Sequence, residues 1–94
     1  MKLLSTSTPR LASHVRMQWD GARNGWVLQA PERLLYPDEM AVAVLRLCDG
    51  ARTLQAIVSE LAAEYQAPPE AVRDDIVELL QPLADKGLLV DGAA

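Results

Sequence analysis

The sequence predicts an α+β fold: a winged helix-turn-helix-like domain in which an N-terminal three-stranded antiparallel sheet is followed by three helices. Residues 15–20 alternate apolar and polar side chains, as a strand with one buried face requires. From residue 38 to residue 86, apolar residues recur at helical spacing in three segments that glycine and proline separate. The chain has 94 residues, which is enough for one domain with one modest core.

The first two strands are expected to form a hairpin. An Asp-Gly pair at residues 20–21 and an Asn-Gly pair at residues 24–25 bracket a loop in which positive φ is easy. Residues 26–30 should therefore return antiparallel to the first strand. Pro31 then interrupts the sheet because it lacks a backbone donor. We expect only a short third strand at residues 33–36, at an edge of the sheet.

The first two helices have clear start and stop signals. The first begins at Asp38, whose side chain can accept from the amides of the first turn, and ends at Gly50, which can adopt a left-handed conformation. The second begins at Thr53, a good N-cap, and ends before Pro68. Its apolar stripe is the clearest in the chain and consists of Leu54, Ile57, Val58, Leu61 and Tyr65.

The third helix is predicted over residues 70–86, with two prolines before it and Gly87 after it. Pro82 lies inside this helix, where it removes one hydrogen bond and should kink the last turn. Residues 88–90 are apolar and fit either a closing strand or an apolar tail.

The two ends are predicted to be less ordered than the middle. Residues 1–13 are rich in serine, threonine and proline and predict a flexible tail, residues 14–90 predict the single domain, and residues 91–94 predict a C-terminal tail. No stretch is long and apolar enough for a membrane span, so we expect no membrane contact. Cys48 has no second cysteine to pair with, which favours a reduced thiol in a cytoplasmic protein.

No pattern in the sequence indicates catalysis. His14 is the single histidine and lies at the start of the first strand, while Cys48 is predicted among apolar side chains, without the base that a nucleophile needs. The adjacent carboxylates of Asp74 and Asp75 leave their helix in different directions. No pair of cysteine and histidine residues suggests a metal site, and no glycine-rich loop could hold a phosphate. We therefore predict no enzyme activity, no metal and no cofactor.

DNA binding is the main alternative, because the third helix of a winged-helix regulator enters the major groove. Here that helix, counted to Lys86, carries five carboxylates and two basic side chains, a net charge of −3. Phosphate contacts supply much of the affinity for DNA, so this surface would repel it. Charge is also divided along the chain: residues 1–36 carry five basic and two acidic groups, and residues 37–94 carry four basic and eleven acidic groups. Such a division can steer a charged partner toward one side.

The third helix has more apolar surface than one packing face needs. Four residues cluster within roughly 60° and form the expected core stripe: Val72, Ile76, Leu79 and Leu83. Three more widen the apolar arc to roughly 140°, beyond the ~100° of a helix that packs once: Val77, Leu80 and Ala84. This flank either packs under residues 88–89 or the hairpin, or it binds a partner.

The predicted third strand is a second candidate for a binding surface. Residues 33–36 are apolar at three successive positions, and a free strand edge can accept a further strand. The chain's own tail or a second copy could cover the same edge. A strand-exchanged homodimer is therefore also expected.

Several short motifs follow one another at defined intervals between residues 15 and 89. They are Met17-Gln18-Trp19, Trp26-Val27-Leu28, Pro31-Glu32, Leu45-Arg46-Leu47-Cys48-Asp49-Gly50 with Thr53 and Ile57, and Lys86-Gly87-Leu88-Leu89. In this order and spacing the chain resembles the D proteins of pyrroloquinoline quinone (PQQ) biosynthesis. It departs from the family pattern at Arg33, where glycine is usual, and at Pro37-Asp38, where a Leu-Asn pair usually opens the first helix.

The resemblance implies a non-catalytic peptide chaperone of PQQ biosynthesis. It implies that the chain binds a ribosomal precursor peptide as an added strand between the third strand and the third helix. It also implies that the chain presents this peptide to a radical S-adenosylmethionine enzyme. Transferred to this sequence, the peptide-binding residues are Arg33, Leu34, Leu35, Tyr36, Arg73, Val77, Leu80 and Ala84.

Overall fold

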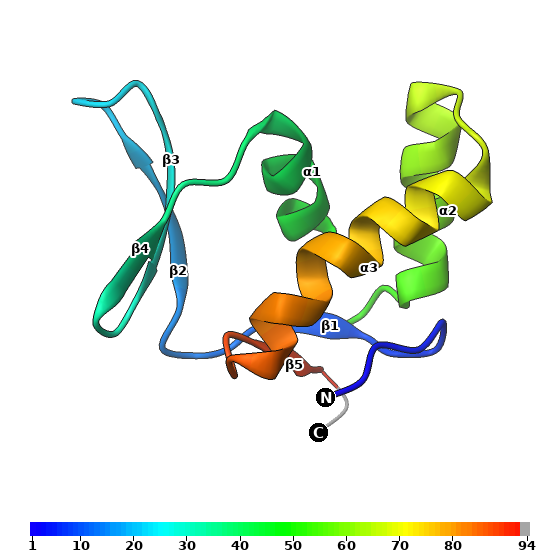
Figure 1. Cartoon of the computed structure of the whole chain (residues 1–94), viewed down its shortest axis with the longest axis horizontal. Helices are drawn as coiled ribbons and strands as arrows, with labels where there is room; N and C mark the ends of the chain where they lie inside the picture. Colours follow the sequence, from blue (N-terminus) through cyan, green and yellow to red (C-terminus); the bar gives the residue numbers. More distant parts are fainter. Residues whose placement is uncertain (93–94) are drawn as a thin grey trace.

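The computed structural model describes residues 1–92, and its helices lie beside two small antiparallel sheets (Figure 1). The elements are β1 (Pro9–Leu11), β2 (Arg16–Asp20), β3 (Gly25–Ala30), β4 (Arg33–Leu35), α1 (Glu39–Leu47), α2 (Leu54–Tyr65), α3 (Pro69–Asp85) and β5 (Leu89–Asp91). The predicted α+β class with three helices is confirmed. The sheets differ from the prediction in one respect, since five strands form two sheets.

The sheet β2-β3-β4 is the predicted one. Strands β2 and β3 form an antiparallel hairpin with Trp19 opposite Trp26, and Asn24 in its loop has a φ of 56°. Strand β4 pairs with β3 so that Leu35 lies opposite Leu28. In the order β2-β3-β4, β4 is an outer strand, as predicted for residues 33–36.

The second sheet corrects the expected N-terminal tail. The sequence predicts that residues 1–13 are flexible, but β1 pairs with β5 along its whole length, and Leu3 and Ala12 are buried. The carbonyl oxygens of Ser5 and Ser7 accept from the first two amides of α2, at 3.0 and 2.8 Å. These backbone bonds give a polar, proline-containing segment an ordered place that its composition does not reveal.

The C-terminal end is also more ordered than predicted. The sequence left two possibilities for residues 88–90, a closing strand or an apolar tail. The structure shows a strand, β5, which extends to Asp91, where the C-terminal tail was expected to begin. The side chain of Thr8 donates to Asp91 Oδ1 at 2.7 Å, which joins the two strands at this end. Residues 93 and 94 of the expected tail lie outside the described residues.

The starts of the first two helices confirm the capping analysis. Asp38 Oδ1 accepts from the backbone N–H of Ala41 at 2.8 Å, and Thr53 Oγ1 accepts from that of Ala56 at 3.1 Å. Both caps satisfy amides that have no partner within the helix.

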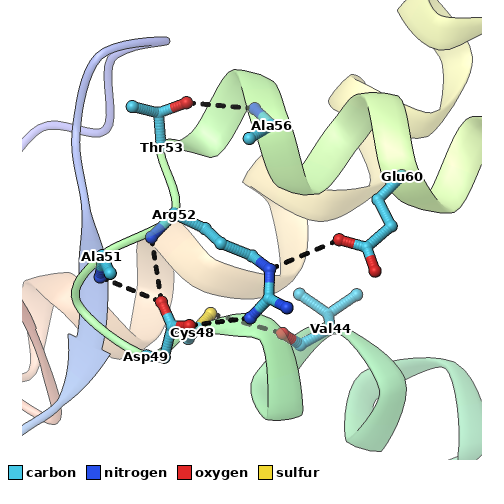
Figure 2. A network of polar contacts seen from close by, with 8 residues as sticks. All are labelled: Val44, Cys48, Asp49, Ala51, Arg52, Thr53, Ala56 and Glu60. Carbon is cyan, nitrogen blue, oxygen red and sulfur yellow. Dashed lines mark hydrogen bonds and ion pairs between the residues drawn. The ribbon is translucent and has the colours of Figure 1, made fainter.

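The turn between α1 and α2 is held by one carboxylate (Figure 2). Asp49 Oδ1 accepts from the backbone amides of Ala51 and Arg52, each at 2.9 Å, and Oδ2 pairs with the Arg52 guanidinium at 2.7 Å. These contacts lower the pKa of Asp49, with the Arg52 amide as the largest cause. Gly50 has a φ of +80° and donates its N–H to the carbonyl oxygen of Pro9. The motif that ends in Asp49-Gly50 is therefore structural, because it joins two helices to β1.

Helix α3 is rotated relative to the sequence prediction. Its buried residues are Ile76, Leu80, Leu83 and Ala84, and Leu80 is 0% exposed. Val72 and Leu79, which were expected in the core stripe, are only half-buried. Helix α3 contacts both α2 and β5, and the N-terminal segment lies over it as a cover, with Leu3 buried in the same core. Gln81 makes this cover specific, since its side chain accepts from the Leu3 amide at 3.0 Å and donates to the Met1 carbonyl at 2.7 Å.

Candidate functional site

The outer edge of β4 is the first part of the site. Within residues 1–92, β4 pairs with β3 alone, so its other edge faces no strand. Leu34 and Tyr36 are 52% and 53% exposed, while Leu35 between them packs against the core. The Arg23 guanidinium lies 3.9 Å from the ring centroid of Tyr36, which joins the hairpin loop to the end of β4. The backbone edge and two large apolar side chains are thus presented together.

An apolar hollow of about 300 Å³ lies near the end of this strand. We call it the three-helix pocket, because α1, the end of α2 and α3 form its walls. Its lining consists of Asp38, Met40, Ala41, Val44, Tyr65, Ala67, Ala71, Val72, Asp75, Ile76 and Leu79. Buried Ala41, Val44 and Ile76 belong to the core, and Met40 and Tyr65 are 44% and 48% exposed. The pocket therefore offers apolar surface that the fold leaves uncovered.

The predicted site residues divide into three groups. Arg33, Leu34, Leu35 and Tyr36 lie together along and just after β4, as expected. Leu80 and Ala84 are buried, so the prediction that they form an exposed flank is wrong. Both residues share the core with Leu88 and Leu89, and packing of this flank inside the fold was one of the two alternatives that the sequence left open.

The remaining two predicted residues lie apart from the three-helix pocket. Val77 is half-buried and packs against the core. Arg73 is exposed and lines a different hollow, formed by α2, the start of α3 and Ser5. Helix geometry explains the split, because Arg73 and Val77 share one face of α3 whereas Val72, Asp75 and Leu79 share another.

Three lining residues were missed by the sequence reading. Leu79 was predicted in the core stripe of α3, and Tyr65 was predicted in the apolar stripe of α2. Met40 was not predicted to have any role. A signal for Leu79 was present, since either of two overlapping stripes on α3 could face the core. Only the tertiary packing of α3 decides which stripe is left over. Tyr65 is the last residue of α2, and the apolar stripe of α2 is no longer buried at this end of the helix.

A third hollow, of about 590 Å³, lies on the other side of α1, next to the hairpin. The rings of Trp19 and Trp26 meet edge to face at 5.7 Å, and the Arg46 guanidinium lies 4.8 Å from the Trp26 ring centroid. This surface combines exposed aromatic area with a basic group. It differs in charge from the three-helix pocket, which no basic residue lines.

The chain has one cysteine, and its thiol is not accessible. Cys48 is buried and donates its S–H to the Val44 carbonyl at 3.4 Å, and burial raises the pKa of its thiol to about 12. The thiol therefore stays protonated near neutral pH. In the part of the chain that the structure describes, no three His, Cys, Asp or Glu residues form a group that could hold a metal ion. No helix among residues 1–92 is long and apolar enough to cross a membrane.

The comparisons with known proteins agree with one another. A family model described as coenzyme PQQ synthesis protein D (PqqD) matches residues 25–89. The chain is 50% identical over 86 residues to the PqqA binding protein of Rhodopseudomonas palustris strain TIE-1, covering 92% of this chain and 84% of that relative.

Two solved structures are similar to the fold. One is the solution NMR structure of the PqqD truncation of Methylobacterium extorquens PqqCD, which represents a functional, stand-alone recognition element for ribosomally synthesized and post-translationally modified peptides (RiPPs). It has a TM-score of 0.78 at 41% identity, over 94% of both chains. The other is the crystal structure of PqqD from Xanthomonas campestris, with a TM-score of 0.57 at 40% identity, over 92% of this chain and 96% of that one.

Proposed function

Because this chain belongs to the family of coenzyme PQQ synthesis protein D, we propose that it is a non-catalytic chaperone that binds the PQQ precursor peptide, PqqA, by strand addition. The relative from R. palustris is named for PqqA binding, and the M. extorquens domain is named as a recognition element for such peptides. The observation that carries the mode of binding is the outer edge of β4, with Leu34 and Tyr36 exposed beside it. Main-chain hydrogen bonds to such an edge give affinity, and side-chain pockets give specificity.

The scaffold character of the domain supports a role in presentation. The thiol of Cys48 is buried and protonated, and His14 is an exposed residue that lines none of the three hollows described above. The domain would hold the peptide for a separate radical S-adenosylmethionine enzyme in the cytoplasm. A second copy of the chain could use the same β4 edge, so a strand-exchanged homodimer would compete with the peptide.

Binding of a synthetic PqqA peptide, measured by fluorescence anisotropy, tests the proposal. Peptides that carry one N-methylated amide at successive positions would read out strand addition directly. Every second amide of an added strand points to its partner, so methylation should weaken binding about ten-fold or more at alternate residues. A scan without this alternation would contradict strand addition.

A matched pair of variants tests whether β4 is the edge used. Leu34→Glu should weaken peptide binding about two- to five-fold, because a cross-strand apolar contact is lost. Leu4→Glu is the control, since Leu4 is 54% exposed and lies outside the site. If the two variants bind the peptide with equal affinity, the peptide binds at a surface other than the β4 edge.

A further inference from the structure

The three-helix pocket differs from the other two hollows in its charge. Arg73 lines the hollow beside α2 together with Glu70, and Arg46 lines the hollow beside the hairpin together with Asp38 and Glu39, so each of these hollows has a basic group. The three-helix pocket has two charged residues in its lining, Asp38 and Asp75, and both are acidic. An apolar floor with an acidic rim selects a different ligand group from an apolar floor alone.

The two carboxylates are free to meet a ligand. Both ion pairs among residues 1–92 involve Arg52, so neither Asp38 nor Asp75 is already neutralised by a cation of this chain. Both residues are exposed. Asp38 uses Oδ1 to cap α1, and the position of that carboxylate at the rim is fixed by the cap.

The floor suits an apolar side chain. Ile76 and Val44 are 2% and 1% exposed and close the base, while half-buried Leu79 and Val72 line α3. Met40 stands exposed at the rim, and its flexible thioether side chain can adapt to a bound group. A volume of about 300 Å³ is at the lower end for a ligand site, which fits one or two side chains of a peptide.

The pocket also lies within reach of a peptide on β4. Asp38 follows Leu35 by three residues, so their Cα atoms are at most about 11 Å apart. A segment that leaves the β4 edge toward α1 needs only about three or four further residues to arrive.

We propose that the three-helix pocket binds an apolar side chain of the peptide that has a lysine or arginine beside it, and that Asp38 and Asp75 receive this cation. The inference rests on the proposed peptide-binding function and adds a specificity to it. The anchor lies just outside the stretch that pairs with β4. Binding at this point depends on charge, and added salt weakens it.

Charge reversal at adjacent helix positions tests the inference. Asp74 and Asp75 are neighbours on α3, both are exposed, and only Asp75 lines the pocket. Asp75→Lys should weaken binding of the PqqA peptide about five- to ten-fold, because an attraction is replaced by a repulsion. Asp74→Lys makes the same change in net charge and should alter the affinity less than about two-fold.

Peptide variants complete the test. Each lysine or arginine of the peptide is replaced in turn by glutamate, and one such peptide should bind Asp75→Lys more tightly than the original peptide does. Met40→Gln should weaken the original peptide without changing its salt dependence. Equal effects of Asp75→Lys and Asp74→Lys, with peptide binding intact, would overturn the inference and leave the proposed function standing. A wild-type chain that binds no peptide would reject both.

Discussion

The two sides of α3 carry similar apolar side chains but differ in how far these side chains are buried. Leu80 and Ala84 belong to the core and are 0% and 5% exposed. Leu79 and Val72 face the three-helix pocket and remain half-buried. Of two adjacent leucines on one helix, one is thus buried in the core and the other lines an open pocket. Residue type alone does not separate them, because the difference comes from what packs against each side.

The cover over the sealed side comes from both ends of the chain. Residues 1–12 and β5 reach α3 from opposite ends of the sequence, and β1 and β5 join them by a backbone ladder (Figure 1). The open side has no such cover among the described residues, so apolar area stays accessible there. In a small domain this division decides which apolar surface stabilises the fold and which remains accessible.

The largest expected effect separates the two leucines. Leu80→Glu would bury a carboxylate that has no partner, and this should cost more than about 4 kcal/mol and unfold most of the protein. Leu79→Glu should cost about 1–2 kcal/mol, because the new side chain can reach water through the pocket. Circular dichroism during thermal unfolding measures both. If Leu79→Glu unfolds the domain as Leu80→Glu does, the two sides of α3 are equivalent.

Removal of the cover is the second test. Deletion of residues 1–8 removes the buried Leu3 side chain from the core and the carbonyl partners of the first α2 amides. This should lower the free energy of unfolding by about 2–4 kcal/mol. The affinity for the PqqA peptide should change little, since the segment lies outside the three-helix pocket. Urea unfolding with and without peptide gives both values. Loss of peptide affinity in a deletion variant that is still folded would place the N-terminal segment in the binding site.

Thiol reactivity compares the two sides of α3 with the smallest expected effect on stability. The pKa of Cys48 is raised to about 12 by burial, so a thiol reagent at pH 8 should modify it only when the domain opens. In a Cys48→Ala background, Leu79→Cys should react at least ten times faster than Leu80→Cys, because only the first faces the pocket. Equal modification rates for the two cysteines would mean that the Leu80 side of α3 is as accessible to the reagent as the pocket side.

The same thiol gives stability a pH dependence. The neutral form of Cys48 is favoured in the folded state, so its contribution is complete below pH 9, where the unfolded thiol is also protonated. The contribution is lost as the pH rises from about 9 to about 12. Cys48→Ala should remove this part of the slope.

The sequence by itself determined the local structure. Asp38 and Thr53 cap their helices because an acceptor before a helical run satisfies free amides, and the Asp-Gly and Asn-Gly pairs close the β2–β3 hairpin. The outer position of residues 33–36 was also predicted, from Pro31. These outcomes rest on neighbours in sequence. The family resemblance followed from the same short-range motifs and was confirmed.

Only the tertiary structure decided how those elements use their surfaces. The order of residues 1–12 depends on β5, about eighty positions away, and on carbonyl groups that any residue carries. The orientation of α3 depends on its packing against α2 and β5, which leaves Leu80 and Ala84 in the core and Leu79 at the pocket. An apolar arc of roughly 140° on a helix is wider than one packing contact needs. Which contact is internal is set by long-range packing, and helical periodicity contains no information about it.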